Sequence, residues 1–132
     1  MKTTYCFLAV LLLAAALLFA GCTSTQGSTT EHWLYTNDSG KTIDANIGDT
    51  IIVSLDENPT TGYSWDLNGG GLTLVSDNYT VTSPELMGSG GVHVWNFSAS
   101  SEGIYEITGI YMRPWENATA SDETWNATVV VK

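Results

Sequence analysis

The side chains that most often carry enzymatic chemistry are few in this sequence and stand apart from one another. The two histidines, His32 and His93, are not at a metal-ligand spacing from each other or from a cysteine. Neither a G-x-S-x-G nucleophile elbow nor a glycine-rich phosphate loop occurs. The 14 carboxylates are scattered, so no pair is marked out as an acid and a base. We therefore expect a protein that is not an enzyme and that holds no metal and no cofactor.

One short segment between two apolar runs has the composition of a stiff loop. It reads Asn58, Pro59, Thr60, Thr61, Gly62. Pro59 fixes its own φ and pushes Asn58 toward an extended conformation, whereas Gly62 can adopt a positive φ. A plain turn needs proline and glycine, but it does not need two threonines between them. The pair of hydroxyl residues therefore indicates a contact surface.

A second segment, Gly88, Ser89, Gly90, Gly91, precedes an apolar run that begins at Val92. Its three glycines remove the side chains that would keep another backbone at a distance. Taken by itself, this segment also fits a flexible hairpin connection.

A third segment, Arg113, Pro114, Trp115, Glu116, directly follows an apolar run. Tryptophan and arginine are the residues found most often at interface hot spots, and the neighbouring proline makes the loop rigid. The alternative is a tryptophan that folds back over the core as a lid.

Together the three segments resemble the signature loops of the chagasin-type inhibitors of cysteine peptidases. The matching residues are 58–65, 88–91 and 111–115, in the order and at about the spacing of that family. The resemblance spans 42–132, and the first and third segments are the specific ones. The sequence departs from the family pattern at Gly109, where similar proteins carry a large apolar residue.

The resemblance implies an immunoglobulin-like antiparallel β-sandwich whose three loops lie side by side and enter the cleft of a papain-like cysteine peptidase. Within the peptidase-binding segment 58–62, Thr60, Thr61 and Gly62 would cover the catalytic cysteine and histidine. The segment 88–91 would pair by its backbone along one arm of the cleft, and 113–115 would pack on the other arm. It implies reversible, competitive inhibition, with a peptidase as the partner.

The sequence pattern independently favours an all-β domain. Short runs with a period of two alternate with turn residues, and no segment after residue 30 has a helical period. We predict strands over 50–55, 63–67, 79–82, 92–99, 104–112 and 125–131. Their inward residues would be Ile51, Val53, Leu55, Tyr63, Trp65, Leu67, Trp95, Phe97, Ala99, Tyr105, Ile107, Tyr111, Trp125, Ala127, Val129 and Val131. A sandwich fits this pattern best, and a closed barrel is the alternative.

The N-terminal segment has the features of an export signal. Lys2 precedes an apolar run over 7–20 that is too short to span a membrane comfortably. The residues 18–22 resemble a lipobox, so we expect a lipoprotein signal peptide over 1–21 and lipid on Cys22. An ordinary signal peptide with an incidental cysteine is the alternative. A Ser/Thr-rich tether over 22–30 would then join the anchor to a domain over 31–132.

These features predict an exported, monomeric protein that is attached to the cell envelope or cell surface through lipid alone. Loss of the signal leaves Cys22 as the only cysteine, so no internal disulfide forms and no cysteine nucleophile is available. The formal net charge of −10 excludes nucleic acid as a partner, because phosphate contacts need clustered Lys and Arg.

Five acceptor sequences permit N-glycosylation. They begin at Asn37, Asn78, Asn96, Asn117 and Asn126.

Two other functions fit a small β-sandwich. The first is an immunoglobulin-like adhesion or glycan-binding module, for which Trp115 and Trp33 would supply aromatic surface. The second is a scaffold lipoprotein of the envelope. A glycan-binding module gives no reason for the Asn-Pro-Thr-Thr-Gly segment.

Overall fold

The computed structural model describes residues 27–132. The predicted signal peptide (1–21) and Cys22 lie outside the described residues. The elements in chain order are β1 (Glu31–Tyr35), η1 (Thr36–Asp38), β2 (Lys41–Ala45), β3 (Thr50–Glu57), η2 (Pro59–Thr61), β4 (Ser64–Asn68), β5 (Thr73–Val81), β6 (Gly91–Ser98), β7 (Gly103–Met112) and β8 (Glu123–Val131). Both η elements are single 3₁₀ turns. Over residues 27–132, no helix has the length and apolar character needed to cross a membrane.

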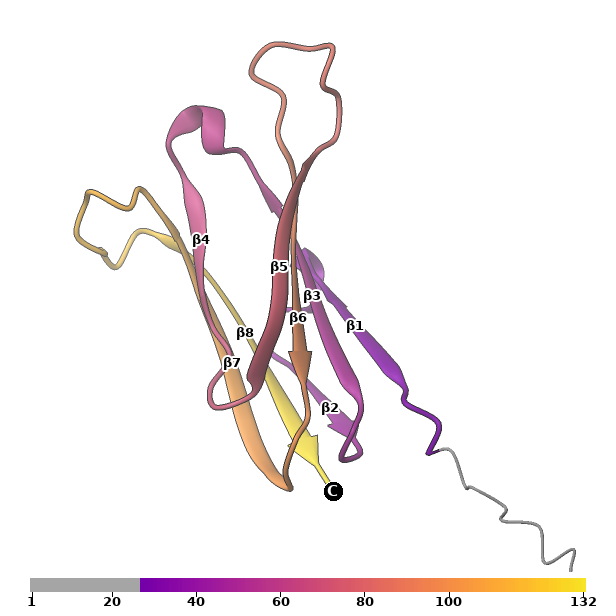
Figure 1. Cartoon of the computed structure of the whole chain (residues 1–132). Coiled ribbons are helices and arrows are strands. Elements are labelled where there is room, and N and C mark those ends of the chain that lie inside the picture. Colours follow the sequence, from indigo (N-terminus) through magenta and orange to yellow (C-terminus); the bar gives the residue numbers. More distant parts are fainter. Residues whose placement is uncertain (1–26) are drawn as a thin grey trace, which may run out of the picture.

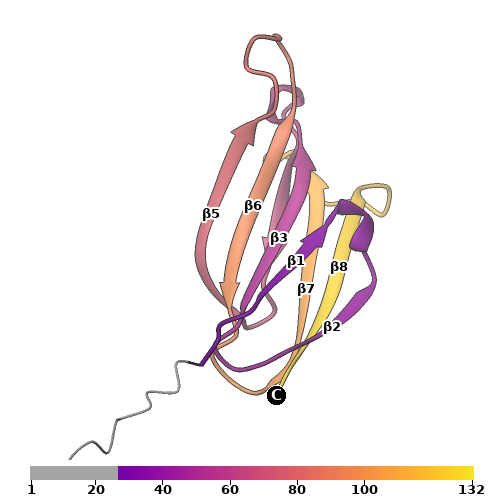
Figure 2. The same ribbon diagram turned by 90° about the vertical axis from the view of Figure 1, so that its right-hand side faces the viewer.

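The strands form two four-stranded sheets that face each other, as Figures 1 and 2 show from two sides. The strand orders are β1-β3-β6-β5 and β2-β8-β7-β4. The predicted sandwich is therefore confirmed, and the sheets do not close into a barrel. Most neighbouring strands are antiparallel, but β1 runs parallel to β3 and β2 runs parallel to β8.

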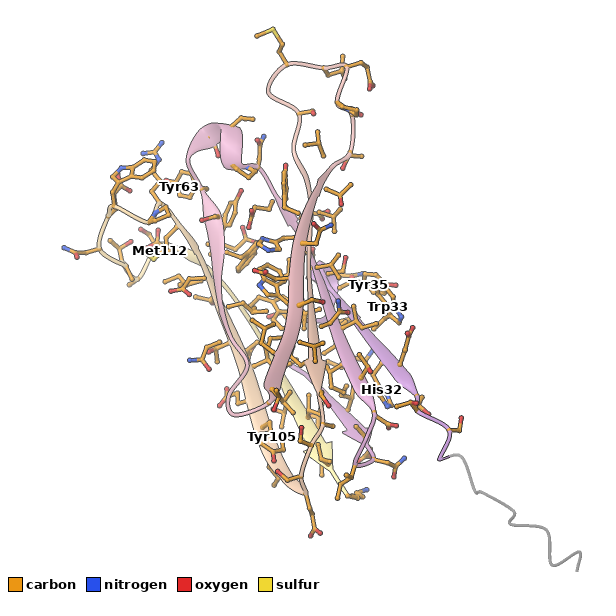
Figure 3. All side chains as sticks on the ribbon, viewed as in Figure 1. His32, Trp33, Tyr35, Tyr63, Tyr105 and Met112 are labelled. Atoms are coloured by element: carbon orange, nitrogen blue, oxygen red, sulfur yellow. The ribbon has the colours of Figure 1, made fainter. Side chains whose placement is uncertain are left out.

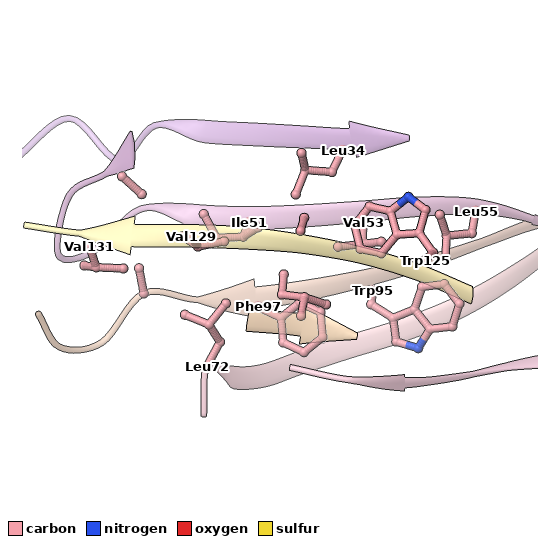
Figure 4. Close-up of a cluster of buried hydrophobic side chains, with 14 of the residues drawn as sticks. Leu34, Ile51, Val53, Leu55, Leu72, Trp95, Phe97, Trp125, Val129 and Val131 are labelled. Carbon is pink, nitrogen blue, oxygen red and sulfur yellow. The ribbon is translucent and has the colours of Figure 1, made fainter. Parts of the chain in front are cut away.

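Alternating side chains of both sheets build one core (Figure 4). The predicted inward residues of β3, β6 and β8 are all buried, as are Trp65 and Ile107. Leu67, Tyr105 and Tyr111 are partly buried against this core. Tyr63 does not join it, because β4 begins one residue later and Tyr63 belongs to the loop end of the sandwich. The alternation of apolar and polar residues thus predicted the core well, since each of these strands turns one face toward the core.

Three strands at sheet edges were missed or cut short in the sequence prediction. In β1 only Leu34 is buried, and in β2 only Ala45 is buried, so neither strand shows a full alternation. The strand predicted over 79–82 is the end of a longer β5, which begins at Thr73. A change of register between Leu74 and Ser76 interrupts the alternation of β5 and hides its first half.

Gly109 fits its place because its neighbours are large. It lies in β7 opposite Leu67 of β4. A Cβ atom at Gly109 would lie 2.8 Å from Cδ1 of Leu67 and 3.2 Å from Cε3 of Trp65. These two side chains occupy the volume that a large residue at position 109 would need, which accounts for the departure from the family pattern.

The N-terminal end of the described chain is fastened by a buried carboxylate. Asp49 accepts hydrogen bonds from the backbone N–H groups of Asn46 (2.8 Å) and Thr30 (3.0 Å), and lies 2.9 Å from Nε2 of His32. These bonds, led by the one from Asn46, lower the pKa of Asp49 to about 2. The entry to β1 is thereby held at the end of the sandwich where His32 lies, as Figure 3 shows.

Candidate functional site

The three loops singled out in the sequence lie at one end of the sandwich. They join β3 to β4, β5 to β6 and β7 to β8, and Figure 1 shows all three at the end opposite the C-terminus and the start of β1. The antiparallel order of these strands brings segments far apart in the sequence to the same edge. The predicted clustering of the loops is therefore present in the structure.

The first loop is a compact 3₁₀ turn with internal hydrogen bonds. The N–H of Thr61 donates to the carbonyl of Asn58 at 3.1 Å, and the N–H of Gly62 donates to that of Pro59 at 2.9 Å. The hydroxyl of Thr61 also donates to the carbonyl of Asn58 at 2.6 Å. Gly62 ends the turn with a φ of 86°, a left-handed conformation that favours glycine. The sequence-based expectation of a stiff loop thus has a structural cause.

The second loop projects beyond the ends of β5 and β6 and is braced from inside. The hydroxyl of Ser89 donates to the carbonyl of Ser83 at 2.7 Å. A Cβ atom on Gly91 would overlap the carbonyl oxygen of Thr80, and one on Gly90 would lie 3.0 Å from the carbonyl oxygen of Glu57. Packing within this chain therefore requires a glycine at position 91 and leaves little room for a side chain at position 90, which the sequence did not reveal.

The third loop packs on the first one and not on the core. The ring of Trp115 lies so close to Gly62 that a Cβ atom there would be 2.6 Å from Cη2. Arg113 lies over the ring of Tyr63, with Cζ 4.7 Å from the ring centroid, and its Nε donates to the carbonyl of Thr61 at 3.4 Å. Trp115 remains 71% exposed. The alternative that this tryptophan covers the core is therefore wrong.

The first and second loops are also linked at the surface. The side-chain amide of Asn58 donates to the carbonyl of Gly88 at 3.2 Å, and the hydroxyl of Thr60 approaches the same carbonyl at 3.4 Å. With the contacts of Trp115 and Arg113, the first loop is bonded to both of its neighbours. The three loops that hold the twelve predicted contact residues are therefore joined to one another, although Gly91 is itself buried.

A buried carboxylate lies beneath this surface and was missed in the sequence. Glu57, the last residue of β3, accepts the backbone N–H of Trp65 at 2.8 Å and lies 3.2 Å from Nδ1 of His93. The ring of His93 stacks on Trp95 at 3.8 Å, and its Nε2 lies 3.5 Å from Asp77. Glu57 and His93 thus tie the stems of the first and second loops together. Within residues 27–132, no group of three or more His, Cys, Asp or Glu side chains could hold a metal ion.

Two further exposed apolar residues stand at the second loop. Leu86 is 62% exposed and Met87 is fully exposed. The two neighbouring side chains give the tip of the second loop an apolar character. The sequence held a signal, because both residues stand directly before Gly88 in a segment otherwise rich in turn residues.

The predicted glycosylation sites differ in exposure. Four of the five asparagines are exposed, and Asn96 is half-buried, with its amide donating to the hydroxyl of Ser76 at 2.8 Å. Asn117 stands in the third loop, two residues after Trp115. Attachment of glycans stays a prediction.

Comparison with known proteins gives a consistent result. A family model described as chagasin family peptidase inhibitor I42 matches residues 44–129. Chagasin from Trypanosoma cruzi is 28% identical over 92 residues, which are 64% of this chain and 84% of chagasin. Amoebiasin-1 from Entamoeba histolytica is 31% identical over 101 residues, which are 73% of this chain and 95% of that protein.

A solved structure shows the same fold. The crystal structure of the cysteine protease inhibitor EhICP2 from Entamoeba histolytica superposes with a TM-score of 0.72 at 24% identity. The match covers 79% of this chain and 97% of EhICP2.

Proposed function

Since the chain belongs to the chagasin family of peptidase inhibitors, a family of inhibitors and not of enzymes, we propose that its three loops block the cleft of a papain-like cysteine peptidase. Inhibition would be reversible and competitive. The observation that carries this proposal is the bonding between the loops, which gives a single stiff surface before any partner binds.

The first loop is suited to cover a nucleophile without being cleaved. A peptidase acts on an extended peptide that can reach its near-attack geometry. In this 3₁₀ turn the carbonyls of Asn58 and Pro59 accept the N–H groups of Thr61 and Gly62, so the backbone is folded and would not lie extended across the catalytic cysteine. The turn is already ordered, and this lowers the entropic cost of binding.

The neighbouring loops would grip the two arms of the cleft. On one side the backbone around Gly88 is open, since a Cβ atom there would meet nothing within 4 Å, and Leu86 and Met87 add apolar area. On the other side the exposed ring of Trp115 supplies an anchor. Arg113, supported by the ring of Tyr63, would contribute polar contacts.

The test is a titration of papain with residues 27–132, read by hydrolysis of a fluorogenic peptide. We expect the apparent inhibition constant to rise linearly with substrate concentration and activity to return on dilution. The inhibitor should stay intact on prolonged incubation. No inhibition at a large molar excess, or cleavage of the first loop, would contradict the proposal.

The location of the protein is a separate part of the proposal. The start of β1 lies at the end of the sandwich away from the loops (Figure 1). A lipid anchor on Cys22 at the cell envelope would therefore leave the loops facing outward, on a monomeric domain. Replacing Cys22 with Ser should release the protein from the membrane fraction; unchanged retention would contradict the anchor.

A glycan-binding role is the second candidate, and one observation favours it. Trp33 and Tyr35 stack with ring centroids 6.1 Å apart on β1 and are 45% and 49% exposed, on the side of the sandwich and not on the loops (Figure 3). Aromatic rings of this kind can stack on sugars. Glycan-array binding that is lost in Trp33→Ala, with inhibition unchanged, would support this role.

A further inference from the structure

One tyrosine joins the strand that leads into the third loop to the start of the first loop. Tyr111 lies in β7, two residues before Arg113. Its hydroxyl accepts the backbone N–H of Asn58 at 2.9 Å. Asn58 follows β3, which belongs to the other sheet. The bond therefore crosses the sandwich directly beneath the loops.

This bond differs from the other polar links between the loops. The contacts from Asn58 to Gly88 (3.2 Å) and from Arg113 to Thr61 (3.4 Å) are long and exposed to solvent. The bond to the hydroxyl of Tyr111 is shorter and partly buried. Water competes less well for a buried donor, and a buried N–H left without an acceptor is costly.

The ring that carries this hydroxyl is itself held in place. Its centroid lies 5.1 Å from that of Trp65, a core residue, and 5.5 Å from that of Tyr63. Tyr63 in turn supports the guanidinium of Arg113. The hydroxyl of Tyr111 is thus carried by a ring that packs on the core through Trp65. Through Tyr63, the same group of rings reaches the end of the first loop and Arg113 of the third.

We propose that Tyr111 is a positioning residue, whose hydroxyl sets the first loop relative to the third. The proposal rests on the inhibitory function proposed above and names a residue that would not itself touch the peptidase. Without the hydroxyl, the N–H of Asn58 lacks its partner, and the turn from Pro59 to Thr61 samples more conformations before binding. The affinity for the peptidase falls because these conformations must be reduced to one.

The experiment compares two substitutions that each remove one hydroxyl from β7. Tyr111→Phe keeps the aromatic packing. Tyr105→Phe is the matched control, because Tyr105 bonds through its hydroxyl to Ser101 at the opposite end of the sandwich. We expect papain inhibition to weaken about tenfold in Tyr111→Phe, equivalent to about 1.4 kcal/mol, and to be unchanged in Tyr105→Phe. Thermal melts of both variants report whether they are folded.

A second readout needs no peptidase. Amide hydrogen exchange of Asn58, Thr61 and Gly62 is measured by NMR in the parent and in both variants. Exchange that is faster in Tyr111→Phe but not in Tyr105→Phe supports the positioning role. If none of the proteins inhibits papain, this exchange result still stands and only the proposed function fails.

Three results would overturn the inference. The first applies when the parent inhibits papain: a folded Tyr111→Phe variant that inhibits papain as strongly as the parent. The second is exchange at these three amides that is the same in Tyr111→Phe and Tyr105→Phe. The third is an Asn58 amide in the parent that exchanges as fast as a solvent-exposed amide. This result can be obtained even if Tyr111→Phe does not fold.

Discussion

Trp115 carries the most exposed aromatic ring of the three loops, and its removal gives the sharpest prediction from the proposed function. A tryptophan buries about 150–250 Å² when fully covered, so its 71% exposed fraction leaves about 100–180 Å² for a partner. At about 25 cal/mol per Å², covering that area contributes about 2.5–4.5 kcal/mol before the costs of association. Trp115→Ala should therefore weaken inhibition by about 2 kcal/mol or more, which is roughly thirtyfold.

The assay is the inhibition constant against papain, with thermal melts in parallel. Trp115 lies outside the core, so the melting temperature should stay close to that of the parent. Trp33→Ala is the matched control, because it also truncates a partly exposed tryptophan but on β1, away from the loops. A folded Trp115→Ala variant that inhibits within twofold of the parent, or an equal loss in Trp33→Ala, would refute the reasoning.

Three further predictions concern the stability of the scaffold under the site. Gly91→Ala should destabilise the fold by about 1–3 kcal/mol in urea unfolding, because the added carbon overlaps a carbonyl of β5. Asp49 has a folded pKa of about 2, below its unfolded value of about 3.9. The ionised Asp49 therefore stabilises the fold above about pH 4, and this stabilisation is lost as the pH falls toward 2. The urea midpoint of Asp49→Asn should accordingly fall less between pH 4 and pH 2 than that of the parent. Glu57→Ala should cost about 1–3 kcal/mol, since it leaves the N–H of Trp65 unpaired, whereas Glu57→Gln keeps an acceptor and should cost less. Equal midpoints for these last two variants would count against that role.

The parts of the fold that the sequence predicted are those where one strand face meets the core. In β3 and β8 every second side chain is buried, so a period of two marks the strand. In β1 and β2 the single buried residues, Leu34 and Ala45, give no period. Their parallel pairing with β3 and β8 depends on which edge each strand reaches, and no local pattern encodes that.

The three loops could be recognised in the sequence, but the bonds within and between them could not. Proline, glycine and tryptophan mark the three loops through their own conformational and surface properties. The bonds from Tyr111 to Asn58 and from His93 to Glu57 join residues 53 and 36 positions apart. Such partners become neighbours only after both sheets are in place, so the sequence shows a histidine and a carboxylate without showing that they meet.

The parallel pairing of β1 with β3 has a mechanical consequence. A pull on Thr30 draws β1 toward the end of the sandwich where that residue lies, whereas a partner bound at the first loop, as proposed above, would hold β3 from its other end. The force then runs along the strands, and the pairs from Glu31 with Thr50 to Tyr35 with Ser54 are loaded together in shear. Bonds loaded in this way must break at once and not one after another. A domain attached at its N-terminus and bound at its loops, as we propose, would therefore bear tension along this strand pair.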